Sequence, residues 1–163
     1  MHIPGVSSNP DVVSSPVETS PLQSTPLNTW QESPGVSARF PDPARKYDTP
    51  GLGDGRSNFT TNTELNQSLR QLVGAANSSG TKAELLTIGN SQDGAPIAAL
   101  LLTRAAGTAP QQLDESGRPT IMLVGQQHGD EPAGGEALLV IAKELSQGSM
   151  QTVLDRVNVL IVP

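Results

Sequence analysis

The sequence predicts an α/β fold: the N-terminal part of a three-layer α/β/α sandwich with a mixed sheet, preceded by a mostly disordered tail. Three observations lead to this prediction. Prolines crowd the beginning of the chain, since nine of the 14 lie in residues 1–58. Two short apolar runs then flank a loop that contains Gly, Asn and Asp, as in a hairpin. Further on, an amphipathic segment separates two more apolar runs, as in a βαβ unit.

Residues 1–58 form the predicted tail. Ser and Thr are interleaved with its prolines, and its apolar residues follow neither the helical nor the strand period. This composition is typical of a solvated linker, with a cell-wall spacer or a protein-docking tail as functional alternatives. Trp30, Phe40 and Tyr47 supply most of the aromatic residues of the chain. The later half of the tail therefore has a second interpretation, an extended strap that buries its aromatic side chains against the domain.

The folded domain is predicted over residues 59–163, and it begins with a helix. Asn62 or Thr63 can cap this helix, which runs to about Ala76. Four apolar residues in it share one face at helical spacing: Leu65, Leu69, Leu72 and Val73. We therefore expect the helix to pack on the core.

A hairpin is predicted next. Residues 84–88 and 97–103 are short strands around a loop with the sequence GNSQDG, which favours an antiparallel pair. The polar residues 104–119 then form a connection.

The last three predicted elements form a βαβ unit. Residues 120–124 are an uninterrupted apolar run, typical of a central strand buried on both faces. A helix is predicted over 131–147, with Asp130 as its cap, Pro132 in its first turn and Gly148 as a left-handed stop. Residues 157–162 are the second strand, which we expect to be parallel to the first through a right-handed crossover. The polar stripe of the helix contains three residues: Glu136, Lys143 and Gln147.

His128 and Glu131 are the candidate metal ligands. They lie in the turn between the predicted strand and helix, at the sheet edge where ligands of open α/β sheets bind. An imidazole and a carboxylate three residues apart can reach one ion, and catalytic zinc commonly takes two His and one Glu. The spacing alone is weak, because an acidic residue in the first turn of a helix and a solvated loop His are both common. From the residues alone, the two side chains could equally have no metal role, with Glu131 stabilising the helix start and His128 solvated.

A family resemblance favours the metal interpretation. The segment IMLVGQQHGDEPAGGEALL resembles the first metal-binding motif of the zinc carboxypeptidases of the carboxypeptidase A type, where an apolar strand leads to H-G-x-E-P-x-G and a helix. Downstream, VNVLIVP resembles the next core strand of that family, and the resemblance covers about residues 60–163. Upstream, five residues resemble the family's hairpin pattern: Gly89, Ser91, Gly94, Pro96 and Ile97. The resemblance implies a zinc-peptidase-like fold and makes His128 and Glu131 the first two Zn²⁺ ligands.

The departure from the family pattern is equally informative. Members of that family supply a third His ligand, a general-base Glu and substrate-binding Arg residues from later in the chain. The only other His here is His2, in the predicted tail, and it is a poor third ligand. Natural domains rarely end inside a strand. We therefore expect residues 59–163 to be a truncated catalytic domain, with no catalytic residue of its own and no turnover in isolation.

The resemblance implies a metallocarboxypeptidase that hydrolyses a peptide bond near a C-terminus by metal-activated water, when full length. Two alternatives stay open. One keeps the fold and changes the substrate, as in N-acyl amino-acid deacylases of the succinylglutamate desuccinylase and aspartoacylase group or in murein peptide amidases. The other is a catalytically inactive binding domain. The implied partner is a peptide or a peptidoglycan peptide, and oligomeric state is open.

Composition excludes several other functions. The net charge is −6 and the pI is about 4.7, with no basic patch, which argues against binding to nucleic acid or to anionic membrane. Cysteine is absent, which excludes disulfides and thiolate metal sites. No stretch is long and apolar enough to span a bilayer, so we expect a soluble protein. No signal peptide is legible at the start, and export is suggested only by analogy with the family.

Overall fold

The computed structural model describes residues 32–41, 44 and 46–163. The chain divides into two compact units, with the boundary between residues 43 and 44. The described part of the first unit contains one short helix, α1 (Pro34–Arg39). The second unit contains the remaining elements. None of the described helices has both the length and the apolar character needed to cross a bilayer.

The first long helix, α2 (Asn62–Ser78), confirms the helix predicted from residue 62 or 63 to 76. Its N-cap is Thr61, so the two predicted caps were wrong by one and two positions. Thr61 is the cap because Glu64 stands three residues later and completes a capping box. The Thr61 hydroxyl accepts the Glu64 N–H at 3.3 Å, and Glu64 Oε2 accepts the Thr61 N–H at 2.8 Å.

The sheet has four strands in the order β1-β2-β4-β3. Strands β1 (Lys82–Asn90) and β2 (Pro96–Thr103) form the predicted antiparallel hairpin. Strand β4 (Asn158–Val162) pairs antiparallel with β2 and parallel with β3 (Thr120–Val124), so the sheet is mixed, as predicted. The parallel β3–β4 pair confirms the parallel strands of the predicted βαβ unit.

Strand β3 is not the central strand that its apolar run predicted. In the described sheet β3 has a strand on one side only, whereas β4 lies between two neighbours. Three of its residues are 45–59% exposed: Ile121, Met122 and Val124. The mistake has a physical cause, because an apolar run reports that side chains favour burial on both faces but does not identify the neighbour that buries them.

Helix α4 (Ala133–Gln147) is the predicted crossover helix, and its ends differ from the prediction in two ways. Its N-cap is Pro132 rather than Asp130, with no side-chain cap bond. At its other end Gly148 is extended, with φ −101° and ψ −155°, and so is not a left-handed stop. Four short helices were not predicted: α1, η1 (Pro50–Leu52), α3 (Pro110–Glu115) and η2 (Gln151–Asp155).

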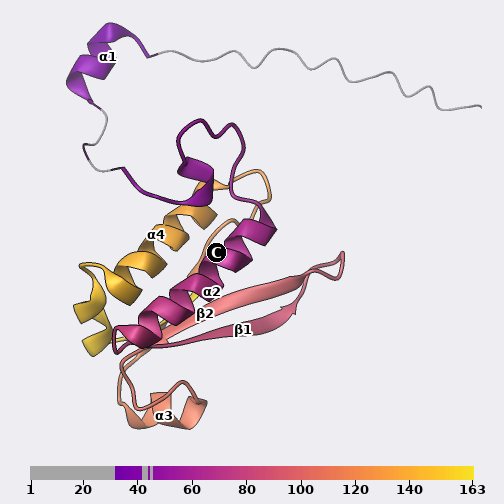
Figure 1. Ribbon diagram of the computed structural model, residues 1–163, viewed down its shortest axis with the longest axis vertical. Helices are drawn as coiled ribbons and strands as arrows, with labels where there is room; N and C mark the ends of the chain where they lie inside the picture. The colour runs from indigo at the N-terminus through magenta and orange to yellow at the C-terminus, as the bar shows by residue number, and fades with distance from the viewer. Residues whose placement is uncertain (1–31, 42–43, 45) are drawn as a thin grey trace, which may run out of the picture. The chain divides into compact units, whose positions relative to one another are not determined.

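Helices α2 and α4 lie side by side against the sheet (Figure 1). Their apolar faces meet alternate residues of β2 and β4 in one core. Its buried members are Leu69, Leu72, Ala76, Ala83, Leu100, Leu102, Leu138, Leu139, Ala142, Leu145, Leu154, Val159 and Ile161. This core fixes the start of α4 relative to the end of β3, where the candidate metal ligands lie.

The predicted aromatic strap is not supported by burial of its aromatic residues. Phe40 and Tyr47 are 69% and 45% exposed, and Trp30 lies outside the described residues. Residues 48–51 of the second unit do contact α4, but through polar groups, as described below. The predicted division of the chain at residue 58 stays a prediction.

Candidate metal site

The loop that carries the candidate ligands begins at Gly125, which contacts both the sheet and helix α4. The Gly125 N–H donates to the Val162 carbonyl at 2.8 Å, which extends the parallel pairing of β3 and β4 by one residue. On its other side Gly125 lies against the first turn of α4. A Cβ at Gly125 would come within 2.8 Å of the Gly134 carbonyl oxygen and of the Leu138 side chain. The loop thus leaves the sheet in direct contact with the helix that follows it.

His128 and Glu131 are brought together at the outer side of this loop. His128 Nδ1 lies 3.0 Å from Glu131 Oε2, and the Glu131 N–H donates to the His128 carbonyl at 3.1 Å. The two side chains are 72% and 67% exposed. Both groups are therefore accessible to an ion from solvent, and the turn between them is closed by a backbone hydrogen bond.

The geometry of this pair fits one metal ion. Zinc binds His nitrogen and carboxylate oxygen at about 2.0–2.2 Å, so two ligand atoms in a tetrahedral site stand about 3.3 Å apart. The observed separation of 3.0 Å is close to that value. The same approach also suits a simple hydrogen bond between an imidazole and a carboxylate, so the pair is compatible with an ion without requiring one.

The described residues supply only these two ligands. No group of three or more His, Cys, Asp or Glu side chains that could hold a metal occurs within residues 32–41, 44 and 46–163. The other histidine, His2, lies outside those residues. A site of catalytic type takes three protein ligands and an open position. The pair is thus at most part of such a site.

Glu136, in the first turn of α4, is buried, which its predicted place on the polar stripe of the helix did not indicate. It was placed on the polar stripe of α4, yet it is 6% exposed. Its Oε1 accepts the Thr60 N–H at 2.9 Å, and the Gly51 N–H donates to the Thr60 hydroxyl at 2.8 Å. A Cβ at Gly51 would lie 2.0 Å from Glu136 Oε1. The carboxylate therefore anchors two segments that precede α2 to the first turn of α4.

The ionised form of Glu136 is favoured in spite of its position. Burial alone would raise the pKa of this carboxyl group. The nearby hydroxyl groups of Thr49 and Thr60, the hydrogen bond from the Thr60 N–H and the positive charge of Arg56 outweigh burial and hold the pKa below its usual value.

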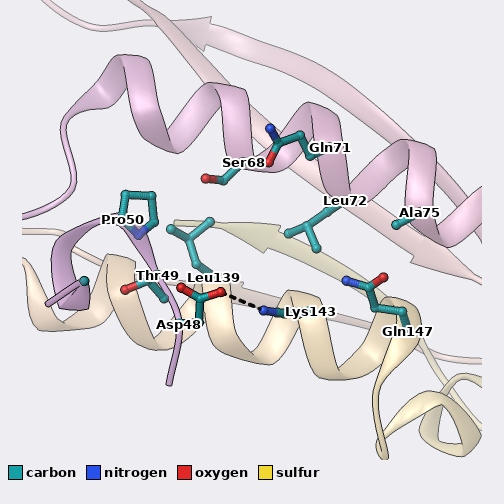
Figure 2. A pocket seen from close by; sticks show the side chains of 11 residues that line it. Asp48, Thr49, Pro50, Ser68, Gln71, Leu72, Ala75, Leu139, Lys143 and Gln147 are labelled. Carbon is teal, nitrogen blue, oxygen red and sulfur yellow. Dashed lines mark hydrogen bonds and ion pairs between the residues drawn. The ribbon is translucent and has the colours of Figure 1, made fainter. Parts of the chain in front are cut away.

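A separate groove lies between α2 and α4 on the side of segment 48–53 (Figure 2). Its volume is about 470 Å³, and Lys143 Nζ and Asp48 Oδ2 form an ion pair across one wall at 3.4 Å. Neither His128 nor Glu131 lines it. The groove is consequently distinct from the candidate metal pair.

Comparison with known proteins gives one family. The model of that family, described as zinc carboxypeptidase, matches residues 68–163. Carboxypeptidase D of Rattus norvegicus is 40% identical over 75 residues, covering 40% of this chain and 5% of the relative. Carboxypeptidase D of Homo sapiens is 34% identical over 99 residues, covering 52% of this chain and 7% of the relative. The chain thus spans less than a tenth of the length of these relatives.

A solved structure supports the fold. The crystal structure of carboxypeptidase A from Helicoverpa armigera superposes with a TM-score of 0.53 at 16% identity. The match covers 65% of this chain and 24% of that structure. At this identity the likeness establishes the fold alone, a mixed α/β arrangement of the carboxypeptidase A kind.

Proposed function

This chain belongs to the zinc carboxypeptidase family, and from that membership we propose that His128 and Glu131 are two of the three protein ligands of a catalytic Zn²⁺. The full-length protein would then be a metallocarboxypeptidase that hydrolyses a peptide bond near a C-terminus. The observation that carries the proposal is the 3.0 Å approach of His128 Nδ1 and Glu131 Oε2 in an exposed loop beyond the end of β3.

On this proposal, the residues of this chain would help to bind the catalytic Zn²⁺. Bound Zn²⁺ would polarise the scissile carbonyl group and lower the pKa of the attacking water. His128 would contribute a neutral nitrogen through Nδ1, and Glu131 would contribute a carboxylate oxygen.

We place the third ligand and the general-base Glu outside the described residues, since residues 32–41, 44 and 46–163 contain no group of three side chains that could hold a metal. On this proposal residues 1–163 alone would have no appreciable peptidase activity. The substrate would be a peptide with a free C-terminus. The similarity to carboxypeptidase D supports a peptidase over the deacylase and murein amidase alternatives.

Metal analysis of the full-length protein tests the proposal. We expect Glu131→Gln and His128→Ala each to lose most of the bound zinc and to lose hydrolysis of C-terminal residues from peptides. The matched control is Glu115→Gln, which removes one exposed carboxylate from α3 and should leave zinc content unchanged. Wild-type zinc content in both ligand variants would refute the assignment. A zinc-loaded wild type without peptidase activity would support the inactive binding domain instead.

A further inference from the structure

Gln126 has an unusual backbone conformation in the loop that carries the candidate ligands. Its φ is +41°, and no other non-glycine residue in the described part of the chain has a positive φ. L-residues other than Gly, Asn and Asp rarely adopt this region, because Cβ crowds the following carbonyl oxygen. Such strain persists only where the surroundings enforce it, and it concentrates at functional sites.

The first turn of α4 enforces this conformation through direct backbone contact. A Cβ at Gly134 would lie 2.7 Å from the Gln126 backbone nitrogen. At Gly135 a Cβ would lie 2.9 Å from the Gln126 side-chain oxygen. Side chains at either helix position would push the loop away. The absence of side chains at the two glycines therefore lets Gln126 pack directly on the helix, and this contact fixes the loop against the start of α4.

The side chain of Gln126 also spans the loop on which His128 lies. Its Nε2 donates to the Gly129 carbonyl at 3.3 Å. The hydrogen bond closes residues 126–129 into a small ring that contains His128. At one end of this ring Gln126 packs on α4, and at the other end Gly129 leads into the turn to Glu131.

We propose that Gln126 is a positioning residue, which holds the His128 imidazole at the separation from Glu131 that a metal needs. The inference rests on the proposed metal role of those two residues. Gln126 itself touches neither the metal nor the substrate. Its twisted backbone sets the direction in which the loop leaves β3, and its amide group limits the movement of the His128 backbone. The groups that orient metal ligands commonly govern affinity nearly as strongly as the ligands do.

Three variants of the full-length protein separate the two contributions. Gln126→Gly keeps the positive φ without strain and removes the amide link. Gln126→Val opposes the positive φ and also removes the link. Gln126→Asn keeps an amide and a residue type that tolerates this backbone region, so it is the conservative rescue. The matched control is Gln127→Val, at the exposed neighbouring position, where no positive φ occurs.

The readouts are zinc affinity, measured by competition with a chromophoric chelator, and the visible spectrum of the cobalt-substituted protein. We expect zinc affinity to fall about 10-fold in Gln126→Gly and up to about 100-fold in Gln126→Val, as for other ligand-orienting groups. Gln126→Asn should stay within about threefold of wild type, since it retains the backbone preference. The cobalt bands should shift in the Gly and Val variants and not in Gln127→Val. Gly tolerates positive φ, so Gln126→Gly keeps the fold and the test interpretable.

Two results would overturn different claims. If the Gly and Val variants bound zinc with wild-type affinity and kept the wild-type cobalt spectrum while His128→Ala lost zinc, the positioning role would be wrong and the metal site would stand. If His128→Ala itself kept wild-type zinc affinity, the proposed function would fail, and the role of Gln126 with it.

Discussion

Glu136 accepts a hydrogen bond from the backbone N–H of Thr60 at 2.9 Å, across 76 positions of the sequence. The bond joins the first turn of α4 to the residue just before the N-cap of α2. Since Glu131 lies five residues before Glu136, this link also ties the loop with the candidate ligands to the segment that precedes the domain's first long helix. We therefore expect changes around Glu136 to affect the stability of the whole helical layer.

Replacing this carboxylate should destabilise the domain. In Glu136→Gln the amide oxygen can still accept a hydrogen bond, but the negative charge that strengthens the bond from the Thr60 N–H is lost. We expect the free energy of unfolding to fall by about 1–3 kcal/mol, the range for weakening a buried charged hydrogen bond. Urea unfolding at neutral pH measures the loss. Glu84→Gln, at an exposed position on β1, is the control and should change little. Equal stability of the two variants would show that Glu136 is not an anchor.

Gly51 should be intolerant of a side chain, because its Cβ would lie 2.0 Å from Glu136 Oε1 and 2.7 Å from the Thr60 nitrogen. Gly51→Ala should therefore lower the free energy of unfolding by about 1–3 kcal/mol through overpacking. Gly53→Ala is the matched control in the same segment. Its nearest atom would be 3.6 Å away and its φ is −64°, so it should be neutral or slightly stabilising. Thermal unfolding of both variants decides the matter, and equal melting temperatures would contradict the packing described.

The loss of folding stability at acid pH should depend in part on Glu64. A side-chain hydrogen bond from Arg56, with further bonds from Thr61, lowers the pKa of Glu64 from 4.5 to about 2. A carboxyl group with a lower pKa in the folded state stabilises the fold above its unfolded pKa, and the stabilisation is lost as the pH falls through the folded pKa. Glu64 should therefore lose its contribution between about pH 4.5 and pH 2.

The measurement is urea unfolding of wild type and Glu64→Gln across that pH range. The wild type should lose its advantage over the variant as the pH falls, and carboxyl NMR titration should place the Glu64 midpoint near 2. A constant difference in the free energy of unfolding from pH 5 to pH 2 would contradict the assignment.

Two helical glycines should respond in opposite ways to the same substitution. Gly134→Ala would place Cβ 2.7 Å from the Gln126 nitrogen, so we expect it to destabilise the domain and displace the loop with the candidate ligands. Gly74→Ala in α2 meets no atom within 4 Å and should stabilise the helix by about 0.5–1 kcal/mol. Chemical denaturation of both variants tests the pair. A stabilising Gly134→Ala would show that the loop does not rest on α4.

Much of this fold could be predicted from periodicity. The apolar spacing of α2 and α4, the turn residues of the β1–β2 hairpin and the short apolar strands β3 and β4 all depend on local sequence. The position of β3 at the edge of the described sheet could not be predicted, because pairing is a long-range property. The helix caps were misplaced by one or two residues because several neighbouring residues are able to cap.

Some residues of the candidate site could likewise be identified from the sequence, and others could not. His128 and Glu131 were identifiable from residue type, spacing and family resemblance, and the structure brings them within 3.0 Å. The burial of Glu136 was not identifiable, since its partners Thr49 and Thr60 are remote in sequence. The strained φ of Gln126 was also hidden, because the sequence does not record the close approach of Gly134.

Anomalous diffraction at the zinc edge, from crystals of the full-length protein, tests the central claim most directly. We predict one strong peak at about 2.0–2.2 Å from His128 Nδ1 and from a Glu131 carboxylate oxygen, the distances typical of zinc ligands. A zinc-saturated crystal in which the peak lies away from these two side chains, or in which they contact only each other, would contradict the account.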